Sequence, residues 1–189
     1  MGLQSTATSL GALFPASCVA GGLAVWCWTR LRPLMAAVFV VAFGGAVGVA
    51  VLLKLLADAY LPPLTGADPW MLSQGAPSGH TVGASVVYGS AAALFARLWK
   101  GPAAWLGVGY CLSVIAVVAM TRVSLHAHTA ADAGAGIVVG LAFAALFDRA
   151  VRMQAKAVQA SPLGLLALLI GIGAIALASG LRISSTHFI

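Results

Sequence analysis

The chain has 189 residues, of which 61% are hydrophobic and only 7% are charged, and its mean hydropathy is +1.03. Soluble domains carry about 25% charged residues, so this composition excludes an ordinary soluble core. The net charge of +6 does not indicate nucleic-acid binding, because the ten basic residues are scattered in short loops, as in a membrane protein.

Six apolar segments predict membrane-spanning helices, since each approaches the roughly 20 residues that a span requires. The runs are continuous and lack the alternation of a barrel strand. We therefore expect an all-α polytopic membrane bundle that forms a single domain over residues 1–189. The predicted helices cover residues 10–28, 34–56, 82–98, 104–121, 131–147 and 162–181.

The lysines and arginines predict the orientation of these helices, because cytoplasmic loops are enriched in both. Most of them fall in the three loops that would share one side: Arg30, Arg32, Arg97, Lys100, Arg149, Arg152 and Lys156. We therefore expect a cytoplasmic (inner) membrane protein with these loops in the cytoplasm. Both termini and the remaining loops would face the periplasm or the outside.

Three outward segments carry polar residues, and an ionisable residue at membrane depth indicates function by default. Lys54 lies about two turns before the second helix breaks at Pro62. The alternative is a lysine whose stem lies along apolar surface and whose ammonium reaches water.

The segment APSGHT, residues 76–81, precedes the third predicted helix. Free backbone N–H groups at a helix start bind anions, and Gly79 would let a ligand approach closely while Ser78 adds a hydroxyl. The alternative is a plain helix cap with Ser78 as the N-cap residue. That alternative does not account for His80.

The segment TRVSLHAHTAADAG, residues 121–134, joins the fourth and fifth predicted helices. His128 and Asp132 are four residues apart and would share a helix face. The carboxylate can then accept the Nδ1–H of His128 and leave Nε2 as a nucleophile, while Arg122 suits phosphate oxygens. A structural ion pair between Arg122 and Asp132 is the alternative. His126, two positions from His128, would point elsewhere.

Pro-Ser-Gly-His at 77–80 and Arg-x5-His-x3-Asp at 122–132 resemble the second and third signature motifs of the type 2 phosphatidic acid phosphatase (PAP2) superfamily. The resemblance covers a core of about residues 50–150. It implies an integral-membrane lipid phosphatase that works without a metal or other cofactor. It also implies that the lipid bilayer and a lipid phosphate are the partners of this chain.

The resemblance implies a role for each motif residue. His128 is the implied nucleophile, which forms a phosphohistidine and is oriented by Asp132. His80 is implied to protonate the leaving oxygen and then to activate water. The implied phosphate-binding residues, which stabilise charge in the transition state, are Lys54, Ser78, Gly79 and Arg122.

The first motif departs from the family pattern, which is Lys-x6-Arg-Pro. Lys54 and Pro62 stand in this register, but Leu61 occupies the arginine position, and Thr121 replaces the serine usual before the third-motif arginine. A charge-assisted hydrogen bond contributes roughly 1.5–3 kcal/mol. Leu61 therefore predicts a slower enzyme or a different head group unless another cation substitutes.

Metal binding is the alternative chemistry, because zinc accepts side chains of these types: His80, His126, His128 and Asp132. The pattern lacks His-Glu-x-x-His spacing, and Lys54 and Arg122 would repel a cation, so we expect no metal. The cysteines lie in apolar runs without metal or disulfide spacing and are expected to be free: Cys18, Cys27 and Cys111. The pairs Gly44/Gly48 and Gly136/Gly140 fit internal helix packing and also dimer faces.

The expected function is hydrolysis of a lipid phosphomonoester or diphosphate at the extracytoplasmic face, in the metabolism of an envelope lipid. Candidate substrates are a polyprenyl diphosphate or phosphate, phosphatidic acid, phosphatidylglycerol phosphate and lipid A phosphates. A lipid phosphotransferase that uses the same phosphohistidine is one alternative. A non-catalytic lipid or anion binder, or a transporter, is the other.

Overall fold

The computed structural model describes residues 3–60, 76–154 and 161–185, with side chains over 16–57, 76–153 and 161–175. Within these ranges the chain is all helical, which confirms the predicted fold class. Leu61 and Pro62, the altered part of the first motif, lie outside the described residues. The helices are α1 (Leu3–Arg30), α2 (Pro33–Tyr60), α4 (Gly79–Leu98), α5 (Pro102–Ser124), α6 (Ala130–Gln154) and α7 (Pro162–Ser185).

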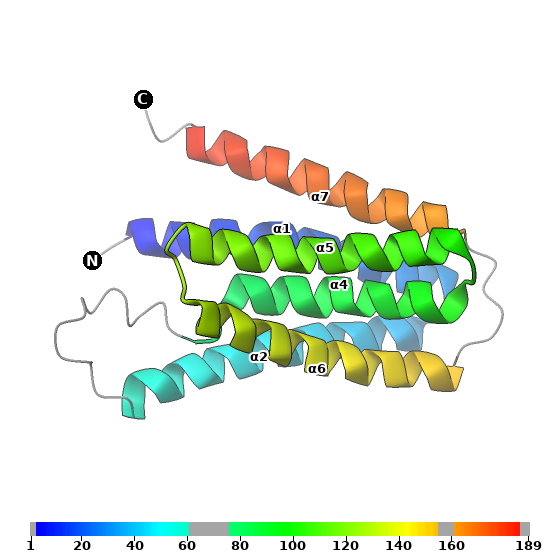
Figure 1. Cartoon of the computed structure of the whole chain (residues 1–189), viewed down its shortest axis with the longest axis horizontal. Helices are drawn as coiled ribbons and strands as arrows, with labels where there is room; N and C mark the ends of the chain where they lie inside the picture. Colours follow the sequence, from blue (N-terminus) through cyan, green and yellow to red (C-terminus); the bar gives the residue numbers. More distant parts are fainter. Residues whose placement is uncertain (1–2, 61–75, 155–160, 186–189) are drawn as a thin grey trace.

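Proline starts three of these helices, at Pro33, Pro102 and Pro162. Proline suits the first helical position because its φ is already helical and the missing N–H would have no partner there. Before Pro102, Gly101 has φ 93°, which turns the chain from α4 into α5. The chain therefore reverses in short connections between α1 and α2 and between α4 and α5 (Figure 1).

Helix α4 lies at the centre of the bundle, where it contacts α1, α2, α5 and α6 (Figure 1). Every residue from Thr81 to Ala91 is buried. The outer helices instead expose large apolar side chains, such as Val41 at 72% and Trp105 at 71%. An apolar outer surface of this kind fits lipid rather than water.

Length and composition support the membrane assignment. Among the described residues, four helical stretches are long and apolar enough to cross a bilayer: Pro33–Ala57, Gly79–Leu98, Pro102–Ser124 and Ala130–Met153. A shorter apolar stretch, Pro162–Ile175, belongs to α7. The structure therefore supports a polytopic helical membrane protein and shows four of the six predicted spans by this measure.

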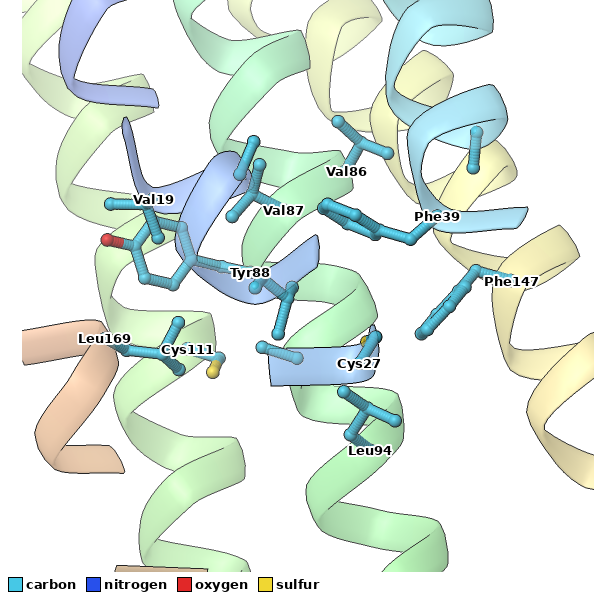
Figure 2. Packing of buried hydrophobic residues seen from close by; sticks show 14 of the residues in the cluster. Val19, Cys27, Phe39, Val86, Val87, Tyr88, Leu94, Cys111, Phe147 and Leu169 are labelled. Atoms are coloured by element: carbon cyan, nitrogen blue, oxygen red, sulfur yellow. The ribbon is translucent and has the colours of Figure 1, made fainter. Parts of the chain in front are cut away.

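The interior is filled by aliphatic and aromatic side chains from facing helices (Figure 2). Phe39 of α2 meets Phe147 of α6 edge-on, with ring centroids 5.6 Å apart. Cys27 and Cys111 are free and buried in this core, as the sequence predicts, whereas Cys18 is partly exposed. This packing fixes the rotation of each helix about its own axis. The rotation decides which side chains near the polar end point into the bundle.

Two glycines let α6 approach α4 closely. A Cβ on Gly136 would lie 2.9 Å from the carbonyl oxygen of Ser78, and one on Gly140 would lie 2.7 Å from that of Val82. The Gly136/Gly140 pair is therefore an internal packing face. A Cβ on Gly44 or Gly48 would meet nothing within 4 Å, so this pair lies on the outside of α2.

Candidate active site

The predicted site residues come from three separated segments whose ends lie at one end of the bundle. The C-terminal turns of α2, the start of α4 and the connection between α5 and α6 all lie there (Figure 1). Arg122 contacts His80 directly, with Nη1 3.3 Å from Nε2. The charge of Lys54 acts electrostatically on both His80 and His128. The structure thus brings the three predicted segments together.

The connection from α5 to α6 begins with a hydrogen-bonded turn centred on His126. The N–H of His126 donates to the carbonyl of Val123, and that of Ala127 donates to the carbonyl of Arg122. His126 has φ 53°, in the left-handed region where glycine usually ends a helix, so the chain forms a Schellman motif. The N–H of His128 also donates to the Arg122 carbonyl, at 3.2 Å. Arg122 and His128 are therefore joined through the backbone.

Helix α6 then begins with a reciprocal capping arrangement. The N–H of Thr129 donates to Oδ2 of Asp132 at 2.9 Å, and the N–H of Asp132 donates to Oγ1 of Thr129 at 3.2 Å. This is a capping box, in which each side chain satisfies the other residue's backbone donor. Thr129 was not among the predicted site residues. Its signal in the sequence is a threonine three residues before an acidic residue at a helix start.

Asp132 lies beside His128 but does not hydrogen bond to it. Oδ2 of Asp132 is 3.8 Å from Nδ1 of His128, which is an ion-pair distance and is too long for a hydrogen bond. Both side chains are largely buried, at 16% and 8% exposed. The alternative pair of Arg122 with Asp132 does not occur among the ion pairs of the described residues.

The start of α4 is tied to the same carboxylate-bearing residue. The N–H of Ser78 donates to the main-chain carbonyl of Asp132 at 3.0 Å. Ser78 occupies the N-cap position, but its hydroxyl makes no capping hydrogen bond. Capping therefore does not explain why a serine, whose side chain is fully buried, stands here.

His80 accepts a hydrogen bond in this structure. A guanidinium only donates, so Nε2 of His80 must be the acceptor in its contact with Nη1 of Arg122. This arrangement places the imidazole proton of a neutral His80 on Nδ1. Arg122 and His80 thus form one polar pair that bridges α5 and α4.

Buried polar atoms without hydrogen-bond partners gather at this end. In the described part of the chain they include Oγ of Ser78, Nε of Arg122 and Nδ1 of His128. Leaving such groups unpaired costs free energy, because each loses its bonds to water on burial. Two of the three, a hydroxyl and a guanidinium N–H, are donors that an oxyanion can satisfy.

The environment of His128 keeps its imidazole neutral at neutral pH. Burial is the main reason that the pKa of His128 is lowered from its usual value, and the positive charges of Lys54 and Arg122 lower it further. The Asp132 carboxylate acts in the opposite direction but does not outweigh them. A neutral imidazole has a free nitrogen lone pair and can act as a nucleophile.

The site does not resemble a metal centre. No three His, Cys, Asp or Glu side chains of the described residues gather closely enough to hold an ion. Two cationic side chains, Lys54 and Arg122, act on the same histidines. This donor set therefore suits an anion better than a cation.

Comparison with known proteins gives the family. The sequence profile of the PAP2 superfamily matches residues 33–156, which is well over half of the chain and includes every candidate site residue. The protein therefore belongs to the PAP2 superfamily, whose members are generally phosphatases. No curated protein and no solved structure matches the chain.

Proposed function

We propose that this protein is a membrane lipid phosphatase that hydrolyses a phosphomonoester or a diphosphate through a phosphohistidine. One observation carries the proposal: a neutral buried histidine, His128, lies among cationic groups and unpaired buried donors at one end of a helical bundle. A cluster of cationic and donor groups suits a phosphate, and a neutral imidazole beside it can attack phosphorus. Membership in the PAP2 superfamily supports the same chemistry.

In the first step, the Nε2 lone pair of His128 attacks phosphorus. A nitrogen–phosphorus bond forms while the bond from phosphorus to the leaving oxygen breaks. Arg122, Lys54 and the Ser78 hydroxyl stabilise the charge on the equatorial oxygens, together with the Gly79 backbone N–H. Asp132, close to Nδ1, stabilises the positive charge that the imidazole gains.

His80 handles the proton. Its Nε2 accepts from Arg122 in the structure, so the acid role requires that phosphate first draws Arg122 away and that this nitrogen then takes up a proton. His80 gives the proton to the leaving oxygen. In the second step it takes a proton from water, whose oxygen attacks phosphorus as the bond to His128 breaks. Inorganic phosphate and the free histidine result.

The substrate is proposed to be a lipid because the site lies at the end of an apolar, lipid-facing bundle. A polyprenyl diphosphate or phosphate, phosphatidic acid, phosphatidylglycerol phosphate or a lipid A phosphate would place its chain in the bilayer and its head group at this end. Basic residues mark the opposite end, where α4 and α6 carry Arg97, Arg149 and Arg152. The positive-inside rule therefore favours a site on the extracytoplasmic face of the cytoplasmic membrane. A topology reporter that places residues 122–132 in the cytoplasm would reverse this assignment.

The test measures phosphate release from these four lipid classes by wild type and by His128→Ala. We expect release from at least one class by wild type and a loss of at least about 10³-fold in the variant, since the covalent step needs the nucleophile. His126→Gly is the matched control. It replaces a neighbouring exposed histidine by the residue that its φ of 53° favours, and we expect it to keep full activity.

Two results would contradict the proposal. If wild type releases no more phosphate than His128→Ala from any lipid, the protein is not a hydrolase of these substrates. If the phosphoryl group appears on a second lipid instead of in inorganic phosphate, the protein is a phosphotransferase. A binder or transporter should retain its lipid affinity in the variant and show neither product.

A further inference from the structure

The capping box at the start of α6 shares its carboxylate oxygen with the candidate nucleophile. Oδ2 of Asp132 accepts the Thr129 N–H at 2.9 Å, and the same atom lies 3.8 Å from Nδ1 of His128. The Asp132 side chain therefore cannot rotate toward or away from His128 without breaking the bond from Thr129. Its position relative to the nucleophile is set by the cap.

The main chain of Asp132 is held by the other half of the box. Its N–H donates to the Thr129 hydroxyl, and its carbonyl accepts the N–H of Ser78. The Thr129 hydroxyl thus fixes the first turn of α6, against which the Ser78 segment is docked. Gly136, one turn further along α6, lets the Ser78 carbonyl approach that helix closely. One hydroxyl is therefore connected to both halves of the site.

We infer that Thr129 is a positioning residue for the proposed reaction, whose hydroxyl acts through Asp132 on His128 and on the Ser78 segment. The inference rests on the proposed function for its kinetic part only. Thr129 itself is exposed, so its side chain contributes little to the packed core. A cap at an exposed helix start would stabilise α6 in any case, so the test must separate positioning from stability.

The experiment compares Thr129→Val, which keeps the shape but lacks the hydroxyl, with Thr129→Ser, which keeps the hydroxyl. We expect Thr129→Val to lower kcat by on the order of 10–100-fold, as small displacements of reacting groups do, with little change in KM. Thr129→Ser should keep kcat near the wild-type value. Thermal unfolding of each variant is measured alongside.

Thr29→Val is the matched control. Thr29 is also exposed, and its hydroxyl donates to the carbonyl of Val25 at 2.9 Å near the end of α1. This substitution removes a hydroxyl that is hydrogen bonded to the backbone, at the opposite end of the bundle (Figure 1). We expect no change in kcat, whatever its effect on unfolding.

A second measurement does not depend on turnover. The imidazole of His128 is titrated by NMR in wild type and in Thr129→Val. The charged groups that act on it are Lys54 from α2, Arg122 from α5 and Asp132 from α6, and His80 of α4 also faces it. Thr129→Val keeps the Thr129 N–H that holds Oδ2 of Asp132 but loses the hydroxyl that accepts the Asp132 N–H. A loosened first turn of α6 should let the carboxylate move away, so the pKa of His128 should fall further in the valine variant.

The outcomes are distinct. If wild type releases no phosphate, the proposed function fails and the titration alone decides the role of Thr129. If Thr129→Val is less stable but has wild-type kcat and an unchanged His128 titration, Thr129 is only a helix cap and the inference is wrong. A kcat of Thr129→Ser as low as that of Thr129→Val would also overturn the inference.

Discussion

Polar and charged side chains lie at both ends of the bundle, but their hydrogen bonds differ. At the basic end, Arg97 donates to both oxygens of Asp148, at 2.9 and 3.3 Å, and Arg152 donates to the same carboxylate at 3.0 Å. At the site end, Nε of Arg122 and Oγ of Ser78 are buried without a hydrogen-bond partner in the described part of the chain. The ion pairs at one end join helices, whereas the other end has, among the described residues, buried donors without partners.

The arginines at the two ends differ in how far their hydrogen-bond donors are paired. Arg97 and Arg152 are about half exposed, at 41% and 57%, so their ion pairs contribute little to stability. The Nε of Arg122 is buried and unpaired, which costs free energy in the folded protein. Binding of an anionic ligand to this N–H group would offset that cost.

The largest expected effect is on activity at the site end. We expect Arg122→Gln to lower kcat/KM by about 10²–10³-fold, because under the proposed function it removes a cation that stabilises charge in the transition state. Arg97→Gln is the same change at the basic end and should leave kcat/KM unaltered. Phosphate release by the two variants is the measurement. Equal losses of kcat/KM would contradict the difference between the two ends.

A smaller effect is expected where α4 and α6 touch between the two ends. In Gly140→Ala the new Cβ would lie 2.7 Å from the Val82 carbonyl and 2.4 Å from Cβ of Ser85. The helices must move apart, which we expect to cost about 1–3 kcal/mol. Gly44→Ala, at an open position of α2, should not destabilise the protein. Thermal unfolding in detergent checks both, and equal stability would show that α4 and α6 are not closely joined.

The smallest expected effect is the pH dependence that His128 contributes at the site end. Because the pKa of His128 is lowered, its neutral form should persist below pH of about 6.5, and the acid limb of kcat/KM should lie under that value. Stability should change in the same direction. The unfolded chain binds the His128 proton more readily than the folded chain does, so stability falls as pH decreases below about 6.5. His128→Asn should remove this part of the slope in unfolding measured against pH. An acid limb above pH 6.5 would contradict the lowered pKa.

Much of the fold was predictable because apolar length and proline placement are visible in the sequence. Pro33, Pro102 and Pro162 begin helices where the hydropathy rises. The helix ends were less accurate. Helix α6 was predicted to end at residue 147 but continues to Gln154, because the prediction followed the apolar run and the helix extends beyond it through polar residues such as Asp148 and Arg152.

The site was predictable as a set of residues but not as a set of contacts. Motif spacing indicated that His80, Arg122 and His128 belong together, and the structure places them at one end. Spacing could not show that Arg122 donates to His80, or that the Asp132 carboxylate is held by the cap rather than bonded to His128. Those details depend on helix rotation and on turn geometry, which hydropathy does not report.

The turn at His126 explains a spacing in the sequence. The Arg122 carbonyl accepts hydrogen bonds from the N–H groups of both Ala127 and His128, so the main chain closes a loop from Arg122 to His128. The five residues between them are the length of chain that ends one helix, reverses through a left-handed residue and prepares the next. Peptide geometry therefore sets this interval: side chains within it can vary, but one inserted or deleted residue would change where Arg122 lies relative to His128.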